Sequence, residues 1–275
     1  MLLDAVFAMK QASISHHICA NTRTRNYFSS KPQLGFTLVE LMIALTISLV
    51  LLLVIGTTFV SSRQAFRVQE DNARIQESGR FALEILGRSI KQAGHADFPF
   101  TGFKVEFDGT AINGTAGAAG VADTLTIQYD GAIDDRDCEG NPVTAAGNII
   151  QNHFNIDAVN ARLQCDGTIA VAPVAPDAPP SGIELVENVE DLQILYGIDT
   201  NGDQSANQYV ALPANWDQVV TARVCVLVRS EKTNIVSAGS YLNCNGAAVA
   251  VPADRRLRRA FTATFNLRNR VNLSP

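Results

Sequence analysis

The sequence predicts an α+β protein in which one long N-terminal helix, membrane-spanning in its first half, packs on an antiparallel β-sheet. Three observations support this fold class. Residues 41–60 form an apolar run without a charge, a helical pattern free of proline continues to about residue 93, and a period of two typical of strands follows. A single helix followed by a series of strands is typical of the α+β class.

Residues 41–60 are long enough to cross a membrane, because about 20 helical residues span a hydrocarbon core about 30 Å thick. One carboxylate, Glu40, stands immediately before this run. A lone charge inside a membrane segment costs about 2.5–3.5 kcal/mol, so we expect Glu40 to have a partner or a purpose. The alternative is a plain signal anchor that happens to contain a glutamate.

The residues around Glu40 resemble the prepilin signature of the type IV pilins, in which a small residue precedes an aromatic one and a glutamate occupies the fifth mature position. Here these residues are Gly35, Phe36 and Glu40. The resemblance implies a type IV pilin-like fold, cleavage by prepilin peptidase between Gly35 and Phe36, and N-methylation of Phe36. Glu40 would then pair with the terminal amine of a neighbouring subunit and set the register between subunits, since a low dielectric strengthens such a pair.

Residues 1–35 are expected to form a cytoplasmic leader, whether translation starts at Met1 or Met9. The leader is basic and has no apolar core of its own, so it does not match a Sec-type signal peptide. The positive-inside rule keeps it in the cytoplasm and sends the C-terminal body into the periplasm. We expect residues 36–60 to span the inner membrane, residues 61–93 to form the periplasmic half of the helix, and residues 94–275 to form a globular β-rich domain.

The periplasmic half of the helix is amphipathic, with an apolar stripe at Val68, Ile75, Ala82, Leu86 and Ile90 that Phe81 and Ile85 widen. The other face is predicted to carry the charges: Arg67, Glu70, Asp71, Arg74, Glu77, Arg80, Glu84, Arg88 and Lys91. Glu70–Arg74 and Glu84–Arg88 are acid-first pairs four residues apart, and Gly94 and Pro99 end the helix. This half should pack on the globular domain; a coiled-coil dimer is the alternative, for which the stripe is short and irregular.

Alternating apolar residues predict the strands of the globular domain. They lie at residues 103–107, 125–129, 148–156, 161–165, 192–196, 220–228 and 261–267, with 148–156 and 161–165 forming a hairpin. Three stretches are loops by composition: 109–120, the proline-rich 171–182, and 199–207. The proline-rich stretch is expected to divide a first sheet region from a second.

Four strings downstream of the helix resemble the PilW group of minor pilins, which is also similar to the J-type pseudopilin of type II secretion. They are DGAIDDRDCEGN, LQCDG, VENVEDLQILYGIDTNGD and RRAFTATFNLRNR. The resemblance implies a minor pilin that primes pilus assembly, with prepilin peptidase, other minor and major pilins, the inner-membrane assembly platform and a tip adhesin as partners. The alternatives are a J-type pseudopilin and, from a different class, a membrane-anchored periplasmic binding protein or enzyme.

Four of the five cysteines follow the leader, namely Cys138, Cys165, Cys225 and Cys244. An even number in an oxidising compartment predicts two disulfides. Four cysteines allow three connectivities, of which we favour the pairing of neighbours in sequence, Cys138–Cys165 and Cys225–Cys244. No C-x-x-C is present, which argues against zinc or thioredoxin-like chemistry.

The sequence lacks the motifs of common enzymes: it has no G-x-S-x-G, no H-E-x-x-H and no glycine followed by lysine for a phosphate loop. After the leader only His95 and His153 remain, and both are expected in structural roles. We therefore expect no enzymatic activity and no cofactor.

Two polar clusters are weaker candidates for binding sites. Asp199, Asn201 and Asp203 have a D-x-N-x-D spacing that suits calcium, but the glycine and glutamate of an EF-hand are missing, so a polar turn is favoured. The basic cluster consists of Arg255, Arg256, Arg258 and Arg259. A DNA contact is the alternative to a salt-bridged start of a strand, and we expect no nucleic-acid partner because the mature chain is acidic.

Overall fold

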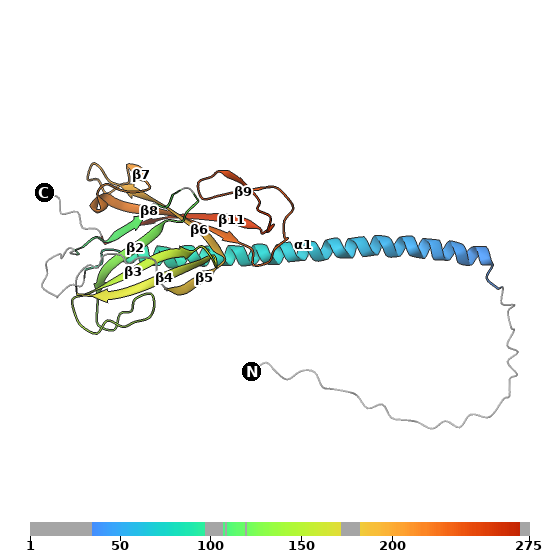
Figure 1. Cartoon of the computed structure of the whole chain (residues 1–275), viewed down its shortest axis with the longest axis horizontal. Coiled ribbons are helices and arrows are strands. Elements are labelled where there is room, and N and C mark those ends of the chain that lie inside the picture. Colours follow the sequence, from blue (N-terminus) through green and yellow to red (C-terminus); the bar gives the residue numbers. More distant parts are fainter. Residues whose placement is uncertain (1–34, 97–106, 108, 119, 172–181, 270–275) are drawn as a thin grey trace, which may run out of the picture. The chain divides into compact units, whose positions relative to one another are not determined.

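The computed structural model describes residues 35–96, 107, 109–118, 120–171 and 182–269 (Figure 1). The chain divides into two compact units, Met1–Ile55 and Gly56–Pro275, and the boundary between these units falls within helix α1. The described part of the first unit is the beginning of this helix. The second unit contains the remainder of the helix and all of the described strands. The predicted leader lies outside the described residues except for Gly35.

Helix α1 covers Leu38–Gln92, which confirms the predicted helix to within a few residues at each end. Gly94, two residues after the end of the helix, stops its continuation, because its φ of 68° is the left-handed conformation that glycine adopts without strain. The side-chain amide of Asn269 donates to the carbonyls of Lys91, Gln92 and Ala93 at 3.1, 3.3 and 3.3 Å. These bonds satisfy carbonyl groups that a helix end leaves without partners.

The strands form two larger antiparallel sheets and a small third one. The five-stranded sheet has the order β1-β2-β3-β4-β5 and contains Ile112–Thr115, Thr124–Gly131, Asn148–Asp157, Arg162–Ala170 and Ile183–Glu187. The four-stranded sheet has the order β11-β8-β6-β7 and contains Arg258–Asn266, Val219–Arg229, Val189–Ile198 and Gln208–Val210. Strands β9 (Ser240–Leu242) and β10 (Ala248–Ala250) pair with each other, and a short 3-10 helix, Trp216–Gln218, precedes β8.

One hydrophobic core joins the second part of α1 to both larger sheets. Ile75, Leu86 and Ile90 of the helix are at most 2% exposed and pack with side chains from the two sheets. In β8 the core residues are Ala222, Val224, Val226 and Val228, the alternate positions that the sequence predicts. In Figure 1 the green and yellow strands and the orange and red strands form two separate sheets along this part of the helix.

The strands predicted from alternation are confirmed as β2, β3, β4, β6, β8 and β11. The predicted hairpin joins β3 to β4, and the Asp157 carboxylate accepts hydrogen bonds from the backbone N–H groups of Val159 and Asn160 in its turn. The strand predicted at residues 103–107 falls mostly outside the described residues. Phe107, which is described, lies outside any strand and is buried with Ala96 and Ile149.

Three expectations are wrong, two about the loops of the body and one about helix α1. The stretch 109–120 is not entirely loop, because it contains β1, which pairs with β2. The proline-rich stretch does not divide the sheets, because β5 follows it and still pairs with β4. The chain passes from one sheet to the other at Asn188, whose φ of 62° lies between β5 and β6. Asp71 is only 1% exposed, so it does not belong to the solvated face of the helix.

Candidate functional site

The first turn of α1 carries the prepilin signature. Gly35 and Phe36 precede the helix in irregular, exposed backbone, and the Phe36 side chain is 85% exposed. Thr37 caps the helix: its Oγ1 accepts a hydrogen bond from the backbone N–H of Glu40 at 3.2 Å, and its carbonyl accepts one from Leu41 N–H. The cap residue and the glutamate three positions later have the spacing of a capping box, a signal in the sequence that the prediction above did not use.

Glu40 therefore occupies the third position of the helix, where the positive end of the helix dipole favours a carboxylate. Its side chain is exposed, and within the described part of the chain its carboxylate has no hydrogen-bond or ion-pair partner. The carboxylate lies within four residues of Phe36. The described part of the chain therefore leaves the Glu40 carboxylate available to a charged group.

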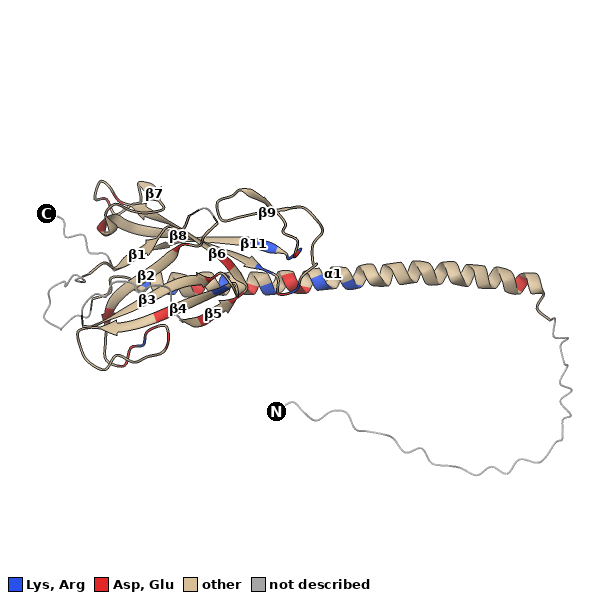
Figure 2. Ribbon diagram, in the orientation of Figure 1, with Lys and Arg blue, Asp and Glu red and all other residues tan. Residues whose placement is uncertain are grey.

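The surface of α1 after Glu40 is apolar on every side. Each large apolar side chain from Leu38 to Val60 is more than half exposed, and α1 is long and apolar enough to cross a membrane. The hydroxyls of Thr46 and Ser48 donate to the carbonyls of Ile43 and Ala44 at 2.9 and 2.7 Å, which satisfies them within the helix. Figure 2 shows this stretch of α1 with neither basic nor acidic residues.

Charged residues return one turn after Val60. The Arg63 guanidinium lies over the Phe59 ring, 4.4 Å from its centroid. Further along, Arg74 pairs with Glu70 at 3.1 Å and Arg88 with Glu84 at 3.5 Å, which confirms both acid-first pairs. The change from an all-apolar to an amphipathic helix separates a segment suited to lipid from one suited to packing on a domain.

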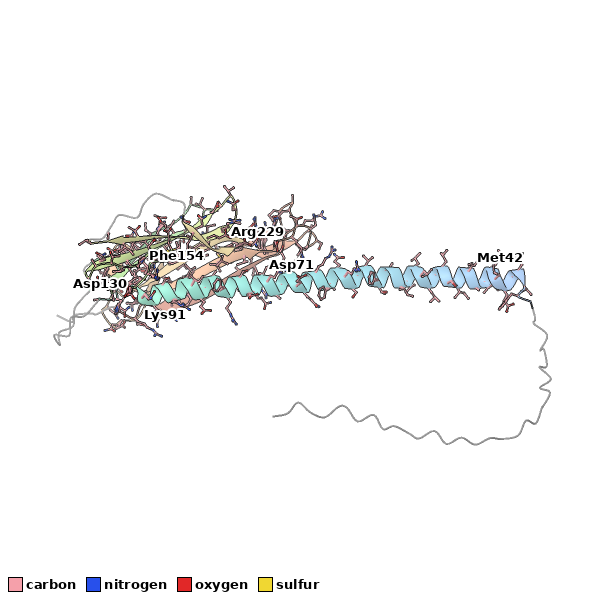
Figure 3. The ribbon with its side chains drawn as sticks, turned by 90° about the horizontal axis from the view of Figure 1, so that it is seen from below. Met42, Asp71, Lys91, Asp130, Phe154 and Arg229 are labelled. Atoms are coloured by element: carbon pink, nitrogen blue, oxygen red, sulfur yellow. A yellow bond between two sulfur atoms is a disulfide. The ribbon has the colours of Figure 1, made fainter. Side chains whose placement is uncertain are left out.

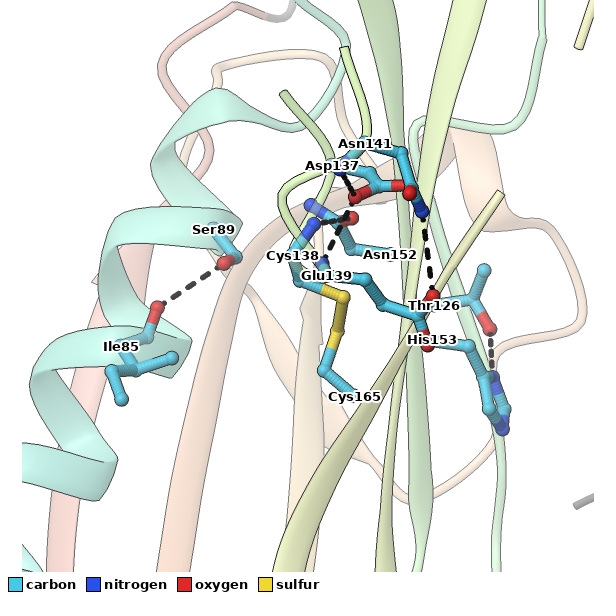
Figure 4. Close-up of a disulfide and its surroundings, with 10 residues drawn as sticks. All are labelled: Ile85, Ser89, Thr126, Asp137, Cys138, Glu139, Asn141, Asn152, His153 and Cys165. Atoms are coloured by element: carbon cyan, nitrogen blue, oxygen red, sulfur yellow. Dashed lines mark hydrogen bonds between the residues drawn. A yellow bond between two sulfur atoms is a disulfide. The ribbon is translucent and has the colours of Figure 1, made fainter. Parts of the chain in front are cut away.

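Two disulfides stabilise the body, and they join Cys138 to Cys165 and Cys225 to Cys244, the neighbours in sequence. The first holds the loop after β2 onto β4 (Figure 4). In the same loop the Asp137 carboxylate accepts hydrogen bonds from the backbone N–H groups of Glu139 and Asn141 at 2.9 and 2.8 Å. The second joins β8 to the loop between β9 and β10.

The candidate calcium loop is largely satisfied by its own backbone. The Asp199 carboxylate accepts hydrogen bonds from Asn201, Gly202 and Gln204 N–H at 3.1, 2.7 and 2.7 Å. Burial by itself would raise the pKa of Asp199, but these hydrogen bonds outweigh it and lower the pKa. Asp203 accepts from Ser205 N–H and from the Asn201 side chain. The three residues lie together, in an arrangement that fits a polar turn.

The basic cluster is joined to acidic residues at the start of β11. Arg258 pairs with Glu190 at 2.6 Å and with Asp254 at 2.7 Å, and Arg229 also pairs with Glu190 at 3.1 Å. The hydrogen bonds from Arg258 lower the pKa of Asp254 to about 2. Arg256 lies 3.6 Å from Asp254. This network fits the salt-bridged interpretation of the cluster.

The two remaining histidines make structural contacts. His153 is 7% exposed on β3, and its Nδ1 shares a hydrogen bond with the Thr126 hydroxyl at 2.8 Å (Figure 4). Burial lowers the pKa of His153. The carbonyl of His95 accepts a hydrogen bond from Asp130 N–H just after α1. Among the described residues, no three His, Cys, Asp or Glu side chains group closely enough to hold a metal ion.

Comparison with known proteins gives two family matches. Residues 153–269 match the family described as Type IV Pilus-assembly protein W, PilW, and residues 30–56 match the Prokaryotic N-terminal methylation motif. Among solved structures, the chain is similar to the Type IV-like pilin TTHA1219 from Thermus thermophilus, with 13% identity over 71% of this chain and 96% of that chain, and a TM-score of 0.46. No curated protein matches.

The methylation-motif match contains Gly35, Phe36 and Glu40, and the PilW match contains β4, β5, β6, β8 and β11. The two matches therefore cover both the first turn of α1 and most of the strands of the body. Residues 153–269 are therefore similar to the type IV pilus-assembly PilW family, and residues 30–56 carry the prokaryotic N-terminal methylation motif.

Proposed function

We propose that this chain is a minor pilin that helps to prime assembly of a type IV pilus. Prepilin peptidase cleaves it between Gly35 and Phe36 and methylates Phe36. Its partners are then other minor and major pilins, the inner-membrane assembly platform and a tip adhesin. The proposal rests on the family and on the character of α1, which carries a lipid-facing surface and one exposed carboxylate in its first turn.

The free carboxylate of Glu40 is the observation that carries the proposal. It lies in the first turn of a helix whose following residues are uncharged as far as Val60. A carboxylate next to hydrocarbon is costly unless it is paired, and the new N-terminus of a neighbouring subunit supplies a positive charge. Pairing of Glu40 with that amine sets the axial register of one helix against the next as the apolar helices leave lipid for a bundle of similar helices.

The backbone at the proposed cleavage site supports access by a peptidase. Gly35 and Phe36 lie before the helix cap and both are exposed. Apart from Gly35 and its chain neighbours, no atom of the described residues lies within 4 Å of where a β-carbon on Gly35 would be. Cleavage there leaves the Thr37 cap intact. The mature helix then begins at Leu38, two residues after the new N-terminal Phe36.

The proposed location is the inner membrane, with the body in the periplasm before incorporation into the fibre. The apolar part of α1 supports membrane anchoring, and the two disulfides support an oxidising compartment for the body. The basic leader supports a cytoplasmic N-terminus.

Mass spectrometry of the N-terminal peptide tests the processing step. The protein is purified from a strain that has prepilin peptidase and from one that lacks it. We expect N-methylated Phe36 as the first residue in the former and an intact leader in the latter. A retained leader in both strains would overturn the proposal. Loss of protein secretion with normal pili, after deletion of the gene, would instead assign the chain to type II secretion as a J-type pseudopilin.

A further inference from the structure

Asp71 of α1 is a buried acid without a partner among the residues that the structure describes. Its side chain belongs to the buried face of the helix together with Ile75, and the residue is 1% exposed. Within the described part of the chain, its Oδ2 has no hydrogen-bond partner and its carboxylate has no ion pair. An isolated buried charge is costly, so buried carboxylates are normally paired or hydrogen-bonded. The contacts of the described residues therefore do not account for the burial of the Asp71 carboxylate.

Asp71 lines a cavity of about 180 Å³ in the second unit. The cavity lies between α1, the turn that joins β5 to β6, and the end of β8. Glu187 and Asn188 contribute from the turn, and Arg229 and Glu231 from the end of β8 and the loop that follows it. Figure 3 labels Asp71 on the helix and Arg229 on the strand. The volume is several times the share of about 30 Å³ that one water molecule occupies in the liquid.

The basic residues around the cavity are already paired. Arg74 makes ion pairs of 3.1 Å with both Glu70 and Glu231, and Arg229 pairs with Glu190 through Nη1. By contrast, three carboxylates in the wall of the cavity have no ion pair among the described residues: Asp71, Glu77 and Glu187. The cavity therefore has an excess of negative charge, and one of its carboxylates is buried. Such a site attracts a cation.

A basic side chain fits this site better than a metal ion does. The described residues contain no group of three acidic or other ligating side chains close enough to hold a metal. The carboxylates are spread around the wall, and a guanidinium can reach several acceptors because it has five N–H donors in a planar fork. The buried Nε of Arg229, a residue that also lines the cavity, likewise has no hydrogen-bond partner among the described residues.

A groove lined by both apolar and charged side chains, Arg80 and Arg259 among the latter, continues from the cavity, and its apolar residues provide a place for the stem of such a side chain. Glu77, Ser78 and Glu187 line both the cavity and the groove. The groove adds Phe81, which is 51% exposed, and Phe261 of β11. Basic side chains bury their aliphatic stems on apolar surface while the charged head finds polar partners.

We propose that this cavity receives an arginine side chain from another pilus subunit, with Asp71 as the principal acceptor. The chemistry of the site rests on the cavity alone. Only the source of the arginine, another subunit, rests on the proposed function. The acidic cavity is thus a second contact point between subunits, in the periplasmic half of α1 and separate from Glu40.

Binding of a small arginine derivative tests the site independently of pilus assembly. The full mature chain in a neutral detergent is titrated at low salt with N-acetyl-arginine amide, and the melting temperature and NMR shifts are followed. N-acetyl-citrulline amide is the matched ligand, because it has nearly the same shape without the charge. We expect saturable binding of the arginine derivative only, and at least tenfold weaker binding to Asp71→Asn.

Asp217→Asn is the matched control variant, because Asp217 is exposed in the short 3-10 helix before β8 and lines neither the cavity nor the groove. It should bind like the unchanged chain. Glu187→Gln, an exposed position on the cavity wall, should weaken binding even if Asp71→Asn proves hard to purify. Asp71→Asn should also keep or raise the melting temperature, because it removes a buried charge without a partner.

Four results would overturn the proposal. They are the absence of saturable binding, which would leave ordered water as the content of the cavity; equal binding of the citrulline derivative; an equal loss in Asp71→Asn and Asp217→Asn; and a stabilisation by calcium that depends on Asp71. A chain that binds the arginine derivative as expected but is not processed at Phe36 would instead contradict the proposed function and leave the site standing.

Discussion

The ring of Phe265 lies against Gly87 where a side chain on the helix would otherwise be. A β-carbon at Gly87 would overlap this ring, and one at Gly79 would overlap the ring of Phe261 in the same way. The two glycines are eight helical residues apart and the two phenylalanines are four strand residues apart, which are nearly equal lengths of about 12 and 13 Å. The last strand therefore lies along α1 with two aromatic side chains in matching positions.

This contact predicts that Gly87→Ala destabilises the protein by about 1–3 kcal/mol, because the ring of Phe265 must move out of a packed position. In an exposed helix the same change is stabilising by about 1 kcal/mol. Thermal unfolding in detergent measures the effect. Each kcal/mol of destabilisation should lower the melting temperature by about 2–4 °C in a domain of this size. Gly56→Ala is the control, because Gly56 is helical and a β-carbon there would meet no described atom within 4 Å other than the neighbouring backbone of the helix. This change should not lower the melting temperature. Equal effects of the two changes would contradict the packing argument.

Glu40→Ala should leave membrane insertion intact and impair incorporation into pili, because it removes the carboxylate proposed to meet a neighbouring amine while keeping the apolar helix. Membrane fractionation and immunoblotting of sheared pili measure the two properties. Asp217→Ala removes an exposed carboxylate from the body, away from the cavity and the groove, and should incorporate normally. Normal incorporation of Glu40→Ala would count against a role in register.

Asp254 predicts a pH dependence of stability. Its pKa is about 2 in the folded protein, below its ordinary value of 3.8, because Arg258 donates hydrogen bonds to it. A lowered carboxyl pKa stabilises the fold above the ordinary value, and this stabilisation is lost as the pH falls from about 4 to about 2. The melting temperature of Asp254→Asn should therefore lie below that of the unchanged chain at pH 5 and approach it near pH 2. A difference that does not change with pH would contradict this assignment.

Removal of either disulfide should cost about 3 kcal/mol, since each closes a loop of moderate length in the unfolded chain. The loops span 27 and 19 residues. The variants are the double changes Cys138→Ser with Cys165→Ser and Cys225→Ser with Cys244→Ser, compared by thermal unfolding. A reducing agent should lower the melting temperature of each variant further, because the other bridge remains. A variant insensitive to reduction would mean that its second bridge does not form.

The loop at Asp199 should not respond to calcium if it is a polar turn, because its carboxylate already accepts three backbone hydrogen bonds. A calcium titration followed by thermal shift measures this. We expect an unchanged melting temperature for the unchanged chain and for Asp203→Asn. A rise that Asp203→Asn abolishes would establish a calcium site.

The parts of the fold that the sequence reveals are those with long, regular patterns. Helix α1 and strand β8 each repeat their apolar period several times, so their residues need no information from elsewhere in the chain. Strands β1 and β5 are short, and each is a strand only because a longer neighbour, β2 or β4, offers its edge. The change of sheet depends on the backbone conformation of Asn188, which a local apolar pattern does not record.

The candidate sites also differ in whether the local sequence is enough to predict them. Gly35, Phe36 and Glu40 form a local motif that can be found from its resemblance to the prepilin signature, and the Thr37 cap can be found from its spacing to Glu40. Asp71 cannot, because on a helical projection it belongs with the charged face. Its burial comes from a turn and a strand end that lie more than 100 residues later in the chain.

The cap at Thr37 has a consequence for the order of events during maturation. The peptide bond after Gly35 lies outside the hydrogen-bonded turn that Thr37 closes, so the helix can be complete before the leader is removed. Proteolysis at that bond would create a positive charge beside the glutamate without any refolding. Under the proposed processing, the first turn of α1 would already have its final conformation in the precursor, and a single cut would convert the precursor into a subunit able to polymerise.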